Sequence, residues 1–299
     1  MNKIALIENG EKTEAQRWAL FAAKKIIDLG SECCVGEELH SKLDENYKEK
    51  VRICSLSEVV KYADAVITFG GDGTMLAASR ELINSEVPIM GVNVGKLGFL
   101  AEYQTEGLEK SIKDVTEGNY RLVDRAVLET EVQGEKFYAL NDFVIEKRNT
   151  SRVMTVETYS DEYYVGSYRV DGIILTTPTG STAYSLSCDG PIIAPSTKVL
   201  CITPISPHTL TLRPLVIPDT NVVSFIVDSP SGESSLVADG HRETSLSNGE
   251  KEVIKTSDLK VKFIKPQNVS YYDVLRNKLL WGANSFDSNI KITSGKNND

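Results

Sequence analysis

A short apolar run that ends in a glycine-rich turn constrains the fold of this chain more than any other feature. Residues 65–69 (Ala-Val-Ile-Thr-Phe) form a near-continuous apolar run, which is typical of a strand buried on both faces. The turn Gly70-Gly71-Asp72-Gly73 follows, and a helix-like run extends from Met75 to Ile83. A strand, a tight turn and a helix in this order favour a parallel sheet, in which ligands bind beyond the carboxyl ends of the strands.

The same alternation of strand and helix signals extends over residues 1–100. Residues 15–29 follow helical spacing with Gly30 placed to end the helix, and Ser57 is the expected N-cap of a short helix that ends at Tyr62. We therefore expect an α/β N-terminal domain, residues 1–100, with a mostly parallel, doubly wound sheet. Its expected strands are residues 4–7, 32–35, 65–69 and 87–93.

After about residue 100 the pattern changes to short β-type runs separated by turn residues, with one helix expected over residues 108–115. This rhythm predicts a second, all-β and sandwich-like C-terminal domain, residues 101–266. The segment 267–299, with a helix signal at 272–281 and a polar tail, is expected to return to the α/β domain. The expected strands of the second domain are residues 125–132, 137–146, 153–159, 163–170, 173–177, 199–202, 222–227, 235–238 and 259–264.

Composition excludes several classes of function. A net charge of −9 and a pI near 5.1 argue against a nucleic-acid partner, because no basic stripe is available to neutralise phosphates. No apolar stretch approaches the roughly 18 residues that a membrane helix needs. Five cysteines without a Cys-x-x-Cys pair, and only three histidines, do not indicate zinc, so we expect no protein-held metal. Reduced thiols and a cytoplasmic location are the expectation.

The glycine-rich turn has the features of a phosphate-binding loop. Glycines allow the backbone to approach a ligand closely, and a helix that begins near Thr74 directs N–H groups and its positive dipole end toward that ligand. Asp72 would be repelled by a phosphate, so it is expected to meet a hydroxyl or a metal instead. The turn thus predicts phosphoryl transfer to an alcohol, with phosphate candidates at Gly70, Gly71, Gly73 and Thr74. The competing interpretation is an Asp that only stabilises a turn.

A second motif, Thr177-Pro-Thr-Gly-Ser-Thr-Ala-Tyr-Ser-Leu-Ser187, follows the apolar run Ile173-Ile174-Leu175. Its hydroxyl and small side chains provide many donors on a surface that a ligand can approach. A Ser or Thr cap followed by a helix would account for one or two of these hydroxyls, but not for so dense a run.

Together the motifs resemble the NAD kinase family. The glycine-rich turn alone is shared with phosphofructokinases and lipid kinases, whereas the second motif is far more specific. The fingerprints Gly-x-Gly-x-x-Gly and Gly-x-x-x-x-Gly-Lys-Ser/Thr are absent, so neither dehydrogenase-type nor P-loop binding is expected. The matching segments are residues 69–74, 93–100, 139–142, 171–172, 177–187, 189–191 and 239–240.

The resemblance implies transfer of the terminal phosphoryl of ATP to the 2′-hydroxyl of the adenosine ribose of NAD, which gives NADP. Asp72 would be the proton acceptor, Mg²⁺ would arrive with ATP, and the chain would form a homodimer or homotetramer. For Arg152 and Arg169 the competing interpretation is that they are solvated arginines on the surface. The residues implied to bind the dinucleotide are Asp72, Gly73, Asn141, Asp142, Arg152, Arg169, Asp171, Thr182, Ala183, Tyr184, Ser185, Ser187 and His241.

Two other functions stay open at this point. A lipid or sugar kinase would share the Gly-Gly-Asp-Gly turn, although the run 177–187 argues against it. A non-catalytic sensor of NAD or NADP would keep the dinucleotide site but would have no need of the base at Asp72.

Overall fold

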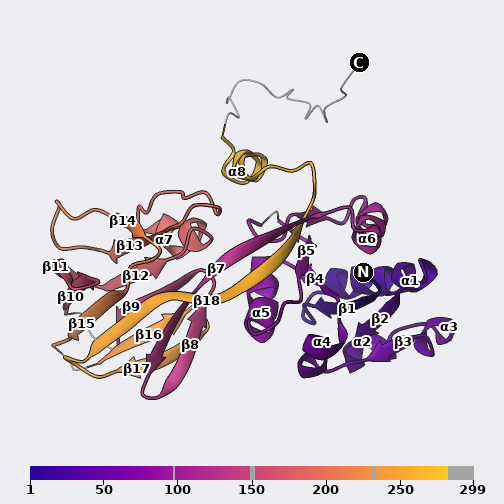
Figure 1. Cartoon of the computed structure of the whole chain (residues 1–299), viewed down its shortest axis with the longest axis horizontal. Coiled ribbons are helices and arrows are strands. Elements are labelled where there is room, and N and C mark those ends of the chain that lie inside the picture. The colour runs from indigo at the N-terminus through magenta and orange to yellow at the C-terminus, as the bar shows by residue number, and fades with distance from the viewer. Residues whose placement is uncertain (97, 149–151, 231–232, 282–299) are drawn as a thin grey trace.

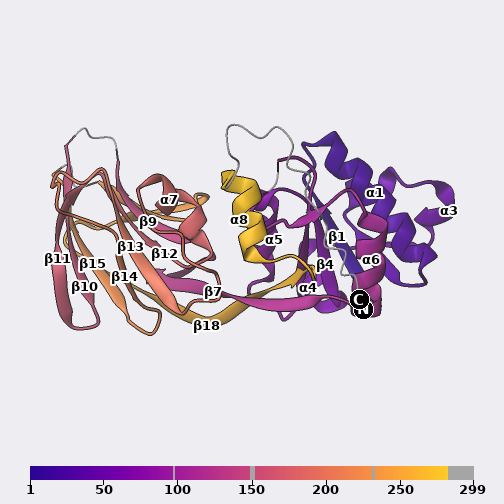
Figure 2. The ribbon, with the colours of Figure 1, turned by 90° about the horizontal axis from the view of Figure 1, so that it is seen from above.

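The computed structural model describes residues 1–96, 98–148, 152–230 and 233–281 of the 299 residues. These form an α/β half, which contains the N-terminus, and a β-rich half beside it (Figure 1). Two long strands, β7 (Arg121–Val132) and β18 (Lys251–Lys265), run from one half to the other (Figure 2). The molecule is therefore elongated along these two strands.

In the described residues, the α/β half has parallel strands in the order β3-β2-β1-β4-β5, and the short strand β6 (Tyr103–Gln104) pairs in parallel with β5. Every residue of β4 is buried, as the uninterrupted apolar run predicted, and the same is true of β5. All four predicted strands are present, and the short strands β3 and β6 are additions. The bounds are β1 Lys3–Glu8, β2 Glu32–Val35, β3 Val51–Ile53, β4 Ala65–Gly70 and β5 Ile89–Asn93.

Helices cover both faces of this sheet. The apolar sides of α1 (Thr13–Asp28) and α6 (Leu108–Glu117) share one buried cluster with it. On the opposite face α4 (Leu56–Tyr62) and α5 (Asp72–Leu82) complete a second cluster. The predicted doubly wound arrangement is thus confirmed. Two short helices, α2 (Glu37–Ser41) and α3 (Glu45–Lys48), lie between β2 and β3.

The β-rich half consists of two packed layers. One layer is an antiparallel sheet in the order β14-β13-β12-β9-β16-β17. The other contains β11, β10, β15, β18, β7 and β8, also antiparallel. Their facing side chains form one buried cluster that includes Phe137, Phe143 and Phe225, so the sandwich-like prediction is confirmed.

The bounds of these strands follow the predicted runs closely, with β14 and β17 as additions. They are β8 Glu135–Ala139, β9 Asp142–Lys147, β10 Met154–Ser160, β11 Tyr163–Val170, β12 Gly172–Thr176, β13 Val199–Ile205, β14 Leu215–Pro218, β15 Val223–Asp228, β16 Ser234–Ala238 and β17 Arg242–Leu246.

Strand β18 makes the two halves parts of one sheet. Near its start Ile254 pairs with Val223 of β15, and near its end Phe263 pairs in parallel with Ile89 of β5. Strand β7 accompanies β18 in antiparallel register over most of this length. The sequence pattern indicated only residues 259–264 of β18, because the alternation in its first part is interrupted by polar residues.

Three local predictions were wrong in detail. The run 137–146 is not one strand but β8 and β9, which are separated at Leu140 and Asn141. The N-cap of α4 is Ser55 rather than Ser57, because the Glu58 carboxylate accepts the backbone N–H of Ser55 at 2.8 Å. Helix α5 begins at Asp72, two residues before Thr74, and this places the Asp in the first helical turn.

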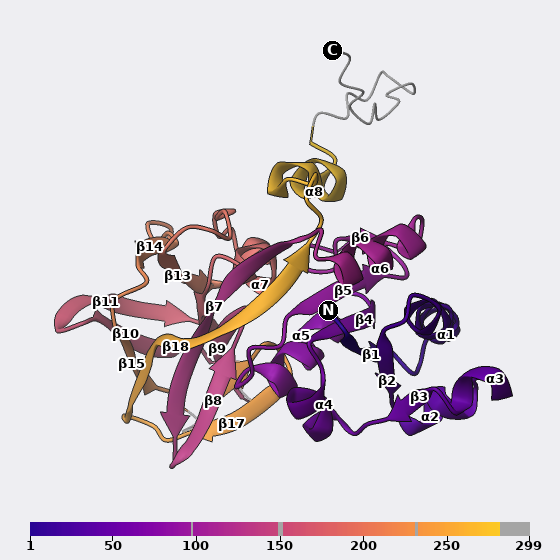
Figure 3. The ribbon, with the colours of Figure 1, turned by 45° about the vertical axis from the view of Figure 1, so that its right-hand side comes forward.

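Helix α8 (Tyr271–Leu279) lies over the junction of the two halves (Figures 2 and 3). Its Lys278 ammonium is 5.7 Å from the ring centroid of Phe99, which follows β5. The polar tail predicted over residues 285–299 lies outside the described residues. The domain boundary at residue 100 stays a prediction.

None of the described helices is long and apolar enough to cross a membrane. The five cysteines are free thiols, and all except Cys188 are buried. Burial raises the pKa of the Cys33 thiol to about 12, so this thiol is unreactive at neutral pH.

Candidate active site

The glycine-rich turn places the first turn of α5 at the carboxyl end of β4. Gly70 is required for close packing, since a Cβ there would lie 2.0 Å from the Thr74 hydroxyl oxygen. At Gly71 and Gly73 a Cβ would meet open space instead. The backbone of these two residues is therefore accessible to a ligand, at a helix end that favours anions.

The Asp72 carboxylate is held by the loop that follows β5. It accepts backbone N–H groups from Phe99 at 2.7 Å, Leu100 at 2.9 Å and Ala101 at 3.1 Å. Gly98 makes this contact possible, since a Cβ there would lie 2.0 Å from Asp72 Oδ1. From the sequence, Gly98 was only one residue of a family motif. The structure shows that its lack of a side chain leaves the space that the Asp72 carboxylate occupies.

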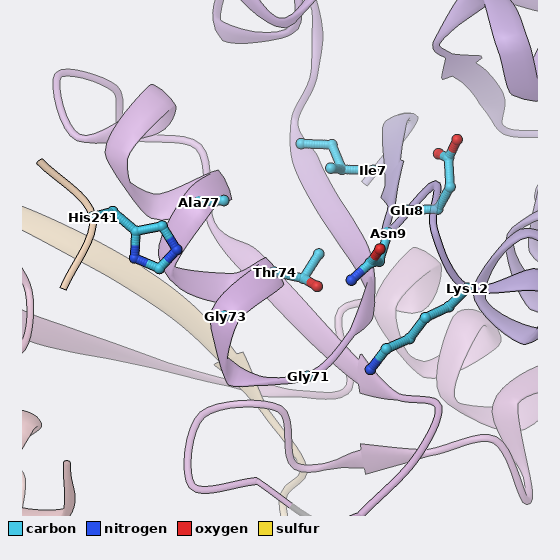
Figure 4. A pocket seen from close by; sticks show the side chains of 9 residues that line it. All are labelled: Ile7, Glu8, Asn9, Lys12, Gly71, Gly73, Thr74, Ala77 and His241. Atoms are coloured by element: carbon cyan, nitrogen blue, oxygen red, sulfur yellow. The ribbon is translucent and has the colours of Figure 1, made fainter. Parts of the chain in front are cut away.

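A cavity of about 410 Å³ opens beside Gly71 and Gly73 (Figure 4). One wall comes from Glu8, Asn9 and Lys12, at the end of β1 and just after it, and β1 is the strand that pairs with β4. His241 of the β-rich half forms part of the opposite side. The cavity thus joins the glycine-rich turn to the second half of the chain.

Sequence reasoning did not select Glu8, Asn9 or Lys12. A signal was available, because Glu8 ends the strand β1 and parallel strands end at the same edge of a sheet. Burial raises the pKa of the Glu8 carboxyl, and the nearby Glu38 adds to this effect.

The second motif is attached to the loop between β8 and β9. The Asn141 carbonyl accepts the Thr177 backbone N–H at 2.8 Å and the Thr176 hydroxyl at 3.0 Å. Gly180 allows this approach, since its Cβ would lie 2.3 Å from the same carbonyl oxygen. The two dinucleotide motifs of the sequence are therefore in direct contact.

Part of the hydroxyl-rich run serves the fold rather than a ligand. The Ser181 hydroxyl donates to the Pro178 carbonyl at 2.7 Å, and the buried Ser185 hydroxyl lies 2.8 Å from that of Thr203. Thr182, Ala183 and Ser187 retain exposed surface along the 3-10 turn Gly180–Thr182 and α7 (Tyr184–Ser187). These more exposed residues are the better ligand candidates.

Asp239 fixes the backbone of the loop 140–142. Its carboxylate accepts the N–H groups of Leu140 at 2.9 Å, Asn141 at 2.7 Å and Asp142 at 3.2 Å. Burial raises the pKa of the Asp142 carboxyl to about 7, and the charge of Asp239 acts in the same direction. Burial also raises the pKa of Asp239, although the three N–H groups and Arg80 oppose this shift.

The Tyr184 hydroxyl is influenced by several acidic side chains. Its side chain is 44% exposed, and burial raises the pKa of its hydroxyl, with further contributions from Cys188, Glu146, Asp142 and Asp171. The Asp171 carboxylate pairs with the Lys147 ammonium at 2.5 Å. Glu146 and Lys147 of β9 were not identified from the sequence.

Both predicted arginines, Arg152 and Arg169, are exposed, and Arg169 is on β11, two residues before Asp171. In the described part of the chain, no three Asp, Glu, His or Cys side chains form a group that could hold a metal ion.

The raised pKa of Asp142 predicts a pH-dependent stability. The folded protein keeps this proton up to about pH 7, whereas the carboxyl has an ordinary value of 3.8, so burial of Asp142 destabilises the fold increasingly as the pH rises between these values. Asp142→Asn removes the ionisation. The variant should therefore gain stability relative to the native protein, and this gain should be larger at pH 8 than at pH 5 by on the order of 2 kcal/mol.

Urea denaturation without ligands at the two pH values measures this difference. Glu131→Gln, at an exposed position of β7, is the matched control and should follow the native protein at both. An equal effect of Asp142→Asn at pH 5 and pH 8 would contradict the prediction.

Both parts of the chain match known proteins. Residues 4–120 match the model of the ATP-NAD kinase N-terminal domain, and residues 140–266 match that of the ATP-NAD kinase C-terminal domain. The chain is 37% identical to the NAD kinase of Bacteroides fragilis, over 95% of this chain and 99% of the relative. It is 42% identical to the NAD kinase of Chlorobium phaeobacteroides, over 78% and 83% of the two chains.

Two solved structures share the fold. One is a yeast NADH kinase complexed with NADH, with a TM-score of 0.84 at 21% identity, over 98% of this chain and 90% of that one. The other is an NAD kinase from Archaeoglobus fulgidus in complex with ATP, with a TM-score of 0.73 at 22% identity, over 94% and 97%. With both domain models matched and relatives aligned over most of its length, this chain belongs to the ATP-NAD kinase family, and its activity is the ATP-dependent phosphorylation of NAD.

Proposed function

We propose that Asp72 accepts the proton of the 2′-hydroxyl of the adenosine ribose of NAD while the terminal phosphoryl of ATP is transferred to that oxygen, which gives NADP. The observation that carries this assignment is the position of the carboxylate. It lies in the first turn of α5, fixed by three backbone N–H groups and adjacent to the accessible backbone of Gly71 and Gly73.

We place the triphosphate of ATP in the cavity beside this turn. The N–H groups at the start of α5 favour anions, and Lys12 extends toward Gly71 from the other wall (Figure 4). A cavity of about 410 Å³ with an ammonium and open glycine backbone suits a triphosphate better than an apolar molecule.

A divalent cation, proposed to be Mg²⁺ bound to ATP, would neutralise phosphate charge. Glu8 and Asn9 would hold it, because Mg²⁺ prefers oxygen ligands and usually keeps several waters and phosphate oxygens in its coordination shell. One carboxylate and one amide on the cavity wall fit a cation that arrives with the nucleotide.

We place NAD along the contact between the loop 140–142 and the second motif. A carboxyl with a pKa near 7, such as Asp142, can donate as well as accept hydrogen bonds at neutral pH. Tyr184 offers an exposed ring on which a base can stack. Further proposed contacts are Gly73, Asn141, Asp171, Thr182, Ala183, Ser187 and His241, with Arg152, Arg169 and the buried Ser185 supported only by the family resemblance.

The chemical step then needs little from the protein beyond position. The ribose oxygen forms a bond to the terminal phosphorus, the bond from that phosphorus to the bridging oxygen of ADP breaks, and the hydroxyl proton passes to Asp72. Because phosphoryl transition states are loose, the proton is accepted late, and orientation of the hydroxyl is the main contribution of the carboxylate.

A homodimer or homotetramer and a cytoplasmic location are part of the same proposal.

Asp72→Asn tests the assigned base. We expect kcat to fall by about 10²–10⁴-fold, because general-base assistance and orientation are lost together, while the KM for NAD changes far less. Steady-state assays of NADP formation measure both constants. The amide nitrogen also cannot accept the Phe99 N–H, so thermal unfolding is compared in parallel. Unchanged turnover would remove Asp72 from the chemistry.

Gly98→Ala tests whether the position of the carboxylate matters without removing it. The added Cβ would overlap Asp72 Oδ1, so we expect kcat to fall by more than about 10-fold. Gly95→Ala in the same loop is the control, because its Cβ would lie 4.0 Å from the Asn93 side-chain oxygen, and its activity should stay within about 2-fold of native. Equal activities for the two variants would show that the carboxylate tolerates displacement.

Lys12→Met tests the proposed ATP side. Loss of one ammonium near the triphosphate should raise the KM for ATP about 5-fold, with little change in the KM for NAD. The exposed Lys110 on α6 offers a control, Lys110→Met, which should leave both constants unchanged. A rise in the KM for NAD instead of ATP would reverse the assignment of the two substrates.

A further inference from the structure

A buried ion pair lies directly behind the loop that holds Asp72. Lys265, the last residue of β18, has its ammonium 2.8 Å from the Glu102 carboxylate, and the side chains are only 4% and 9% exposed. The same ammonium donates a hydrogen bond to the Leu100 carbonyl at 2.9 Å. Lys265 is thus attached to the loop itself as well as to its charge partner.

One peptide group connects Lys265 with Asp72. The Leu100 carbonyl and the Ala101 N–H belong to the same peptide, and this N–H donates to Asp72 Oδ1 at 3.1 Å. The peptide is therefore held between an ammonium on its oxygen side and a carboxylate on its nitrogen side. Hydrogen bonds arranged in series polarise one another, so each strengthens the next.

Stabilisation of the fold does not by itself explain why an ion pair is buried here. Removing both charges from water costs several kcal/mol per ion, and well-packed apolar residues often serve equally well. Burial lowers the pKa of the Lys265 ammonium, although Glu102 opposes this effect. The ring of Phe263 lies 5.4 Å from the ammonium, and Lys265 and Glu102 line a cavity of about 210 Å³.

We propose that Lys265 is a positioning residue for Asp72: through the Leu100–Ala101 peptide it fixes and polarises the backbone N–H group that orients the Asp72 carboxylate. The inference rests on the proposed role of Asp72 and extends it to a residue far along the chain. Lys265 contacts neither substrate in this arrangement, so it acts only through the loop.

The double variant Lys265→Met with Glu102→Gln tests this role, because it removes both charges at nearly constant volume and leaves no unpaired ion of the pair. We expect kcat to fall by about 10-fold, with the KM values for ATP and NAD within about 2-fold of native. Glu102→Gln alone keeps the bond from Lys265 to the Leu100 carbonyl and should retain most of the activity.

Lys265→Arg separates positioning from a merely structural role, because it keeps a charged donor that can reach the Leu100 carbonyl. Its kcat should stay closer to the native value than that of the double variant, with the KM values for ATP and NAD unchanged. Lys265 lines a cavity of about 210 Å³ together with Glu102 and Arg125, and this leaves room for the longer side chain.

A matched control lies on the same strand. Lys262 pairs with Glu86 at the surface, with side chains 32% and 87% exposed, so Lys262→Met with Glu86→Gln should leave kcat unchanged. If the Lys265 double variant folds, as thermal unfolding shows, and keeps the native kcat, the proposal is overturned. A fall in kcat that is equally large in Lys265→Arg also rejects it and leaves only a structural role.

Asp72→Asn, measured in the same series, separates this test from that of the proposed function. If Asp72→Asn abolishes turnover while the Lys265 double variant is native-like, the role of Asp72 stands and that of Lys265 fails. If Asp72→Asn itself keeps native turnover, the proposed base fails and the inference about Lys265 fails with it.

Discussion

The continuous hydrogen-bonded ladder along β18 is the constraint on which the rest of this structure depends. One strand of 15 residues pairs with β15 at one end and with β5 at the other, so the two halves are parts of a single sheet. Ladder hydrogen bonds of β18 therefore connect the two halves directly. The same strand ends in Lys265, directly behind the loop that contacts Asp72.

The site uses the same device twice. Asp72 accepts three consecutive backbone N–H groups from the loop after β5, and Asp239 accepts three from residues 140–142, where β9 begins. The carboxylate accepts N–H groups of the loop that would otherwise need a helix or a sheet as partner. The loop is therefore fixed in position while its other groups stay available to a ligand. One loop orients the proposed base, and the other carries Asn141 and Asp142.

Local sequence patterns were most reliable where burial is uniform and least reliable where a distant carboxylate intervenes. The apolar run 65–69 predicted β4 because both of its faces are buried. The run 137–146 has an equally clear β-type pattern, yet the strand breaks because the N–H groups of Leu140 and Asn141 turn to Asp239, 99 and 98 positions away. No local pattern contains that information. The predicted N-cap of α4 was wrong for a simpler reason, because Ser55 and Ser57 are two residues apart and either could cap a helix.

The sequence by itself determined the two-part architecture, the phosphate-type turn and the family motifs, because periodicity, glycine placement and residue type act over short distances. Tertiary structure alone decided which side chains serve the fold and which line the cavity. It assigned the hydroxyls of Ser181 and Ser185 to internal hydrogen bonds and placed Lys12 and His241 on one cavity. It also put Lys265 in contact with Leu100, 165 residues away. Such contacts depend on how buried polar groups find partners across the assembled sheets, and this is settled only when the chain is packed.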